Sequence, residues 1–167
     1  RLAAKLQLQG IDRSRLTICA SHTHSGPMIR NCANTLFGEP ISDEHWQHIL
    51  QYTAELELKL EQVATEALAD RKPAKLSWSV GKVDFAFNRR TKGGPVDHDL
   101  PLLAVHDLDG KLRAVFTNYA CHCVTLSDDM ISGDWAGYAM DHIQRRNPGC
   151  QAMISIGCGA DSNPRGG

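Results

Sequence analysis

Three segments of the chain share one design, in which a β-rich run ends directly in a polar or glycine-rich loop. They are TICASHTHSGP (17–27), FTNYACHCVTL (116–126) and ISIGCGADSNPR (154–165). In open α/β sheets, ligands bind where strand ends meet such loops. This repeated design constrains the fold more than any other feature of the sequence, and it predicts a sheet with a site at its strand ends.

The sequence predicts two helices between these three segments. Ser42 is a suitable N-cap for a long amphipathic helix that ends near Asp70, with apolar residues at three- and four-residue steps. We expect this helix to pack in the core and assign no chemistry to it. Residues 135–146 predict a second, shorter helix, which the sequence NPG (147–149) ends.

Five segments of the sequence predict β-strands: residues 15–20, 75–87, 101–107, 112–119 and 151–156. The second of these alternates around a central glycine, which favours either a bulged strand or a hairpin. The dipeptide Asp109-Gly110 predicts a hairpin between the third and the fourth.

The order β, α, β, β, β, α, β predicts an α/β fold, a layered domain with a mixed β-sheet flanked by helices. The chain begins at Arg1 inside a helical pattern and stops at Gly167 after a loop of small residues. We therefore expect residues 1–167 to form a single partial domain that is incomplete at both ends.

Composition argues against several classes of function. The formal net charge is −1 and the chain has no run of Lys or Arg, so we expect no nucleic-acid partner. No stretch approaches the roughly 20 apolar residues of a membrane span, so we expect no transmembrane segment. The six cysteines form no CxxC pair, which argues against a zinc knuckle and leaves one or two disulfides open.

The first loop carries two histidines at alternate positions, His22 and His24. In an extended segment the side chains of residues i and i+2 point the same way, so both imidazoles could reach one ion or one substrate. Gly26 and Pro27 would let the backbone turn sharply beside them. The alternative is a pair of solvated histidines at the end of a strand.

The second loop carries the sequence Cys121-His122-Cys123. Alternation places the two cysteines on one side and the histidine on the other, which argues against all three binding one ion. We interpret the thiols as small packing residues and His122 as facing the site, where it could join other histidines on a zinc ion. The alternative for His122 is a hydrogen-bonded core histidine.

Three further positions are candidates, each with a structural alternative. Asp134 precedes a predicted helix, so it could cap that helix or orient a ligating histidine through the second ring nitrogen. Arg89 could stabilise a developing oxyanion or hold a carboxylate, or it could belong to an exposed basic turn. The loop with Ser162 and Asn163 could present a nucleophile or form a surface turn.

Five blocks occur in order, and together they cover about residues 15–165. They are ASHTHSGP, FAFNRR, VDHDLPLLAVHDLDGKLRAVFTNYACHCVTL, ISGDWAGYA and GADSNPR. This combination resembles the N-terminal catalytic domain of the neutral/alkaline, non-lysosomal ceramidases. The resemblance implies a zinc-dependent amidase that splits ceramide into sphingosine and a fatty acid. It also implies a small-molecule or lipid amide as substrate, and it makes a secreted or periplasmic location possible.

The resemblance implies a role for each matching residue. His22 would be the first Zn2+ ligand and His24 would support the metal or polarise the substrate, although either could bind the ion. His122 would be the second ligand, Arg89 would help to stabilise the oxyanion, and Asp134 would act behind a ligand. The remaining ligands of the family, a Glu and a Tyr, lie further along its chain, so the missing C-terminal portion of this chain would complete the site.

One position departs from the family pattern. The family's nucleophilic serine directly precedes the loop proline, where this chain has Asn163 and places Ser162 one residue earlier. Ser162 could replace that serine, although adjacent side chains diverge. Zinc-bound water could attack directly, because zinc lowers the pKa of bound water to about 7. Alternatively, the chain belongs to a relative that hydrolyses another amide or ester, to a different HxH metal hydrolase, or to a catalytically inactive binding domain.

Overall fold

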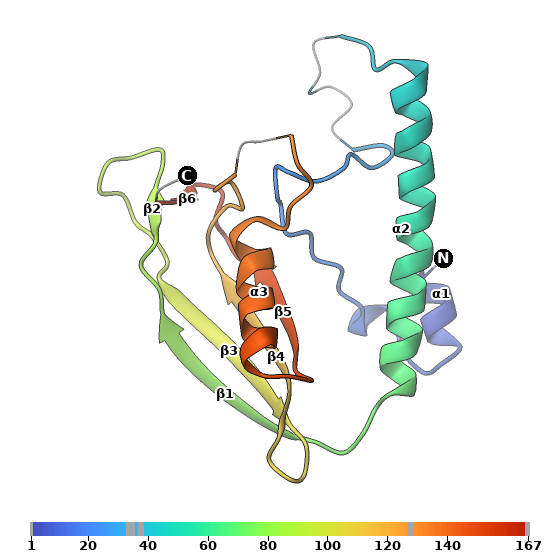
Figure 1. Cartoon of the computed structure of the whole chain (residues 1–167), viewed down its shortest axis with the longest axis vertical. Coiled ribbons are helices and arrows are strands. Elements are labelled where there is room, and N and C mark those ends of the chain that lie inside the picture. Colours follow the sequence, from blue (N-terminus) through green and yellow to red (C-terminus); the bar gives the residue numbers. More distant parts are fainter. Residues whose placement is uncertain (1, 33–35, 37–38, 127–128, 166–167) are drawn as a thin grey trace. The chain divides into compact units, whose positions relative to one another are not determined.

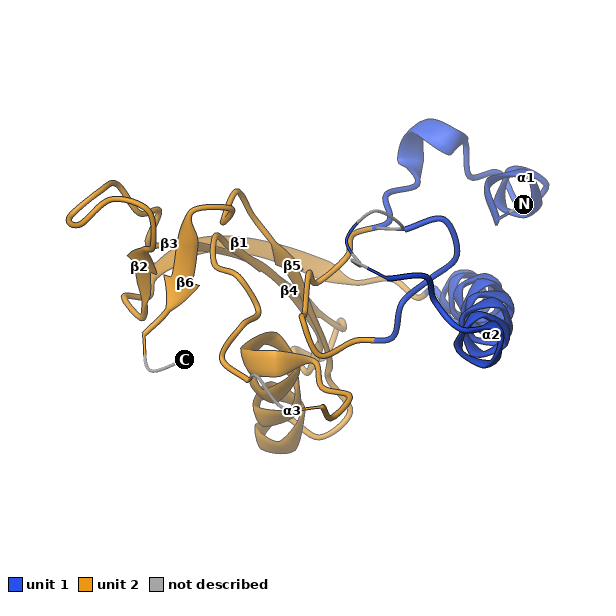
Figure 2. Ribbon diagram, turned by 90° about the horizontal axis from the view of Figure 1, so that it is seen from above, with its two compact units in different colours: residues 1–18, 27–71 blue, residues 19–26, 72–167 orange. Residues whose placement is uncertain are grey.

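The computed structural model describes residues 2–32, 36, 39–126 and 129–165. The chain divides into two compact units, which Figure 2 colours separately. Unit 1 comprises Arg1–Ile18 and Pro27–Arg71, and unit 2 comprises Cys19–Gly26 and Lys72–Gly167. That residues 1–167 form a single domain stays a prediction.

The long helix of unit 1 is the one that the sequence predicts. Unit 1 contains α1 (Leu2–Gln7), the 3-10 turn η1 (Arg13–Arg15) and α2 (Asp43–Ala69), which Figure 1 labels except for η1. The hydroxyl of Ser42 accepts a hydrogen bond from the His45 amide at 3.3 Å, and Asp70 closes the helix at its other end. The predicted N-cap and the predicted end of α2 are therefore confirmed.

The packing of unit 1 differs from the core-packing helix that the sequence predicts. Leu6 of α1 is buried, and Lys5 pairs with Glu61 of α2. Ile49 and Glu61 are the buried residues of α2, whereas Val63 is 58% exposed. Among the described residues, the apolar stripe of α2 is thus only partly covered. No helix in the described part of the chain has the length and apolar character needed to span a membrane.

Unit 2 is built on a four-stranded mixed sheet with the order β1-β3-β4-β5. Its elements are β1 (Lys75–Lys82), β3 (Asp99–His106), β4 (Leu112–Tyr119), α3 (Asp134–Arg146) and β5 (Gln151–Ile156). The pairs β1–β3 and β3–β4 are antiparallel, whereas β4 and β5 run parallel and are joined through α3 (Figure 1). The predicted α/β class with a mixed sheet is confirmed.

The β3–β4 hairpin is confirmed, with a longer turn than the two residues its sequence suggests. The carboxylate of Asp107 accepts hydrogen bonds from the amides of Asp109 and Lys111, at 3.1 and 2.9 Å. Gly110 has φ of +86°, a left-handed conformation that glycine adopts without steric cost. The turn therefore spans residues 107–111.

The two faces of the sheet differ in exposure. Strand pairing places Ala104, Val115 and Ala152 in one row, and all three are buried. The opposite face carries a second row, which runs through Trp78, Leu103, Phe116 and Met153. Trp78 is 70% exposed and Met153 is 46% exposed, because α3 lies over one face only (Figures 1 and 2).

Two predictions about strands are wrong. No strand forms at residues 15–20: the backbone of Leu16 is extended, with φ of −109° and ψ of 118°, but a strand also needs a hydrogen-bonded neighbour. Residues 75–82 form the predicted strand, β1, but residues 75–87 form neither one bulged strand nor a hairpin. The chain leaves the main sheet after β1 and begins β2 (Ala86–Asn88), which pairs antiparallel with β6 (Ser162–Pro164) in a second, two-stranded sheet.

Candidate metal centre

Three imidazoles from two distant segments of unit 2 lie together. The ring centroids of His22 and His122 are 4.8 Å apart, and that of His24 lies 5.1 Å from His22 and 5.9 Å from His122. One nitrogen from each ring can be chosen so that all three atoms lie within 4.8 Å of one another. The two early histidines are exposed and His122 is buried, so the cluster opens to solvent on one side.

The two early rings meet for a different reason from the one that the sequence suggests. His22 is not extended: its φ is +53°, in the left-handed region that residues other than glycine adopt rarely. The loop is tied to the second loop by a bond from the His24 amide to the Cys123 carbonyl at 3.3 Å. The Thr23 hydroxyl also donates to the Ser132 carbonyl at 2.8 Å. A backbone turn, and not strand alternation, brings both rings to one point.

The backbone and ring of His122 are held on three sides. Its amide donates to the Ser162 carbonyl at 2.9 Å, and its carbonyl accepts from the Trp135 indole at 2.8 Å. Its Nδ1 lies 2.5 Å from the Gly159 carbonyl. Since a carbonyl only accepts, Nδ1 is the donor in this contact, and in the neutral ring Nε2 keeps its lone pair. His122 is thus both a hydrogen-bonded buried histidine and a ring with one nitrogen available to a ligand.

The neighbouring thiols pack in the core, as the sequence predicts. Cys121 and Cys123 are 0% exposed. Burial, with the neighbouring Cys123 and Asp134, raises the pKa of Cys121 to about 12, and burial raises that of Cys123 to about 11. Both therefore stay protonated, and metal binding requires the thiolate. All six cysteines of the chain are described, and all six are free thiols.

The geometry and the charge of the imidazole cluster fit a divalent ion that prefers nitrogen ligands. Zinc binds imidazole nitrogen at about 2.0–2.1 Å in tetrahedral sites, which places two ligand atoms about 3.4 Å apart. The Nε2 atoms of His22 and His24 are 3.4 Å apart. Burial, together with the charges of His122, His24 and Arg89, lowers the pKa of His22. This shift favours the neutral imidazole that a metal ion requires.

Arg89 lies beside the cluster, directly after β2. Its Nε and Nη2 atoms donate to the Ala160 carbonyl at 3.1 and 2.8 Å, and Nη2 lies 3.5 Å from Nε2 of His122. Its amide also donates to the Asp161 carbonyl at 2.8 Å. The pairing of β2 with β6 thus fixes a positive charge next to the imidazoles.

The hydrogen bonds of the Asp134 carboxylate go to backbone amides and not to an imidazole, so a role behind a metal ligand stays a prediction. It is 1% exposed, and its carboxylate accepts from the amides of Leu126 at 2.9 Å and Trp135 at 2.7 Å. Burial alone would raise its pKa, but hydrogen bonds from Trp135, Leu126 and Thr125 outweigh burial and hold the pKa below its usual value. The imidazole that it was expected to orient is bonded to Gly159 instead. Asp134 therefore joins the second loop to the start of α3.

The positions of Ser162 and Asn163 in the third loop differ from that of an exposed nucleophile. Ser162 is 2% exposed, and its amide donates to the Gly159 carbonyl at 3.0 Å. Asn163 pairs with Phe87 in the two-stranded sheet. Its Oδ1 is buried and has no hydrogen-bond partner among the described residues. The burial of Ser162 does not support its use as the nucleophile.

No protein-family model matches the chain, and no curated protein sequence matches it. Among solved structures, the crystal structure of neutral ceramidase from Pseudomonas aeruginosa superposes with a TM-score of 0.75 at 20% identity, over 98% of this chain and 28% of that one. A ceramidase complexed with C2 superposes with a TM-score of 0.74 at 19% identity, over the same shares. The chain shares the fold of the corresponding part of these two ceramidases. It spans about 28% of the length of these two ceramidases.

The ceramidase fold that the sequence resemblance implies is therefore confirmed. Two residues of its third loop, which sequence analysis did not single out, matter for this part of the fold. A Cβ at Gly157 would lie 2.6 Å from Oδ1 of Asn118, and a Cβ at Gly159 would lie 2.6 Å from the Cys121 amide nitrogen. Glycine at both positions lets the third loop lie against the second. The Gly-Cys-Gly spacing after a strand was the available signal.

A cavity of about 270 Å³ lies beside the imidazoles. His22, His122 and the backbone of the third loop form part of its wall, with Ala20 and Ile156. Small residues thus leave space next to the candidate metal ligands in this ceramidase fold.

Proposed function

We propose that this chain is part of a zinc-dependent amidohydrolase of the neutral/alkaline ceramidase family. The observation that carries the proposal is the meeting of His22, His24 and His122 in one cluster. The shared fold with neutral ceramidase supports the family assignment. The proposed reaction is hydrolysis of the N-acyl amide of ceramide, which yields sphingosine and a fatty acid.

In this proposal His22 and His122 hold Zn2+, and His24 is a third ligand or polarises the substrate. A zinc ion at this point would act as a Lewis acid on the amide carbonyl. The hydrogen bond to Gly159 keeps the His122 ring in one tautomer and one orientation, as metal-ligating histidines require. We expect a Glu and a Tyr from a later part of the protein to complete the ligand set.

Arg89 is proposed to stabilise negative charge on the carbonyl oxygen. Its guanidinium is anchored through the Ala160 carbonyl, so its charge stays beside the imidazoles. A fixed positive charge stabilises a developing oxyanion without reorganisation at the moment of reaction. Two of its N–H groups reach Ala160, and a guanidinium has five.

A second candidate function is suggested by the third loop. Asn163 occupies the position of the family's serine, and Ser162 is 2% exposed. These two observations favour a relative that hydrolyses another amide or ester without a serine nucleophile, or a catalytically inactive binding domain. The two candidates share the same imidazole cluster and differ in the reaction that the bound metal supports.

The metal site is tested first, by calorimetric titration of the chain with Zn2+ and by metal analysis after dialysis. We expect one zinc per chain, lost in the double variant His22→Ala/His122→Ala. The matched control is His45→Ala/His48→Ala, which removes two exposed histidines outside the cluster. Equal zinc binding by both double variants would contradict the proposed metal site.

The reaction is tested on the complete protein that contains these residues. A fluorogenic ceramide is compared with simple amides and esters. Turnover of ceramide that requires zinc supports the first candidate, and turnover of the other substrates alone supports the second. Zinc binding without turnover of any substrate supports the inactive binding domain.

A further inference from the structure

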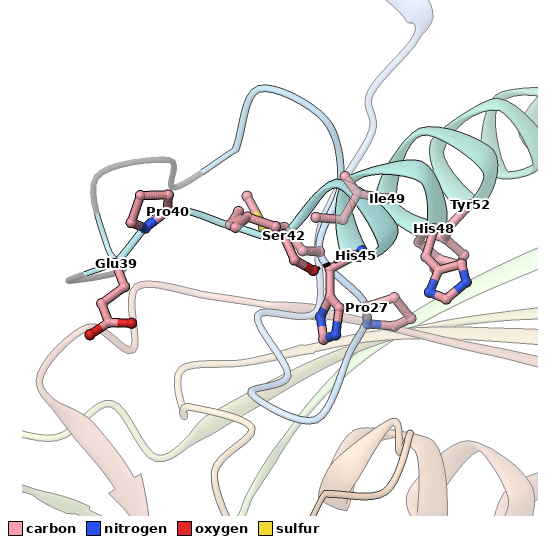
Figure 3. Close-up of a pocket in the computed structure, with 10 residues that line it drawn as sticks. Pro27, Glu39, Pro40, Ser42, His45, His48, Ile49 and Tyr52 are labelled. Carbon is pink, nitrogen blue, oxygen red and sulfur yellow. Dashed lines mark hydrogen bonds between the residues drawn. The ribbon is translucent and has the colours of Figure 1, made fainter.

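Unit 1 contains a pocket of its own, at the start of α2. Its volume is about 760 Å³. Figure 3 shows the side chains that line it, and it places Glu39 and Pro40 at one end and His48 and Tyr52 at the other. The lining residues are Pro27, Met28, Glu39, Pro40, Ile41, Ser42, His45, His48, Ile49 and Tyr52. Pockets of 300–1,000 Å³ are typical of sites for small molecules.

One face of α2 forms a wall of this pocket. His45, His48, Ile49 and Tyr52 follow the spacing i, i+3, i+4, i+7, which places their side chains on the same side of a helix. The ring centroids of His45 and His48 are 6.5 Å apart, so the two imidazoles are neighbours on this wall. Three of these four side chains carry hydrogen-bonding groups, and Ile49 is the apolar one.

The chemistry of the lining narrows the class of ligand. Pro27, Met28, Pro40, Ile41 and Ile49 supply apolar wall on several sides, which favours a hydrocarbon chain or ring. The described lining holds no Lys or Arg, and its acidic residue is Glu39. The Glu39 carboxylate would therefore repel an anionic head group, whereas it would not repel a cationic or uncharged one.

We propose that this pocket binds a small amphiphile with an apolar chain or ring and an uncharged or cationic head group. The chain lies along the apolar walls, and the head lies toward Glu39. The site does not depend on the proposed amidohydrolase function, because every residue that lines it belongs to unit 1 and none belongs to the imidazole cluster.

Binding is measured by NMR of the chain labelled with 13C-methyl methionine, with octylamine, 1-octanol and octanoate as probes. The chain has four methionines, of which Met28 lines the pocket and Met153 is a half-exposed residue of β5. Met28→Leu assigns the pocket signal. We expect octylamine and octanol to shift the Met28 signal to saturation while the Met153 signal stays in place. Octanoate should bind about tenfold more weakly than octylamine.

Chain length and two pairs of variants test the two parts of the proposal. Affinity should rise about fourfold for each methylene added between the hexyl and octyl probes. Glu39→Gln, at an exposed position, should weaken octylamine binding several-fold and leave octanol binding unchanged. Ile41→Arg should abolish binding of all probes, whereas Leu58→Arg, at an exposed position of α2 outside the pocket, should not.

The proposal is overturned if the Met28 signal does not respond, or if Met153 responds in parallel with it. It is also overturned if octanoate binds as tightly as octylamine, or if Ile41→Arg still binds. Helical circular dichroism and an unchanged Met153 signal show that each variant is folded. None of these results depends on zinc or on hydrolysis, so failure here leaves the proposed function standing.

Discussion

The Nδ1 atom of His122 lies 2.5 Å from the carbonyl oxygen of Gly159. This contact joins the loop after β4 to the loop after β5, and it decides which nitrogen of the ring is protonated. With the proton on Nδ1, the lone pair on Nε2 is left for the imidazole cluster. The support of the candidate metal centre is therefore a backbone carbonyl and not a carboxylate.

Gly159→Ala should weaken both folding and zinc binding. The added Cβ would lie 2.6 Å from the Cys121 amide nitrogen, so the third loop must move away and take its carbonyl from His122. We expect a loss of about 1–3 kcal/mol in the free energy of unfolding, typical of overpacking, and weaker zinc binding. Urea unfolding and zinc titration measure the two effects.

Gly137→Ala is the matched control, since a Cβ at Gly137 of α3 would meet nothing within 4 Å. Alanine in a helix is more stable than glycine by about 0.5–1 kcal/mol, so this variant should be at least as stable as the parent. A Gly159→Ala protein with unchanged zinc affinity would show that the carbonyl contact does not position the ring.

Ser162→Ala should leave amide hydrolysis by the complete protein within about twofold of its original rate. Ser162 is 2% exposed, so its hydroxyl is not placed to attack a substrate. Removing a buried hydroxyl should cost about 1 kcal/mol in stability. Initial rates at saturating substrate measure the first effect, and a fall of a thousandfold or more would restore the serine mechanism.

Arg89→Ala should lower the rate of hydrolysis by about 10²–10³, the usual effect of removing one stabilising donor from an oxyanion site. The neighbouring Arg90 is also exposed and serves as the control. Arg90→Ala removes one positive charge but leaves the bond between Arg89 and the Ala160 carbonyl in place. Arg89→Lys should restore little, since a lysine lacks the planar fork. Equal rates for the Arg89 and Arg90 variants would contradict the role proposed for Arg89.

Asp134→Asn should destabilise the fold in a pH-dependent way. The native pKa of Asp134 lies below its usual value, so its carboxylate stabilises the fold above about pH 4, and that stabilisation is lost as the pH falls further. We expect the variant to be about 2 kcal/mol less stable at pH 7, with the difference shrinking below pH 4. Asp141→Asn, at an exposed position of the same helix, should change stability by less than about 0.5 kcal/mol. Urea unfolding from pH 3 to pH 7 measures both.

Thiol reagents should divide the six cysteines into two classes. Cys121, Cys123 and Cys150 are buried with a raised pKa, mainly because burial disfavours the thiolate. The exposed cysteines are Cys19, Cys32 and Cys158. We expect about half of the thiols to react in the native protein and all of them in urea, as counted by a chromogenic disulfide reagent. Rapid native labelling of Cys121 would contradict the burial of the second loop.

Local sequence patterns were sufficient where the interaction is local. The Ser42 cap, the end of α2 near Asp70 and the hairpin at Gly110 depend on residues within a few positions of one another. The sequence also indicated α3, which the NPG sequence ends, and β5, and the order of the elements along the chain indicated a mixed sheet. The packing role of the two cysteines beside His122 was predictable from side-chain alternation alone.

The tertiary structure decided which distant groups meet. Residues 15–20 have β-forming side chains, yet no strand forms there, because a strand is defined by its neighbour. The left-handed backbone of His22, the partner of the His122 ring and the amide partners of Asp134 all depend on contacts between loops far apart in the chain. Sequence by itself singled out the three histidines that lie together in the fold. Only the fold decided which atom of each faces the others, because hydrogen bonds between loops set those orientations.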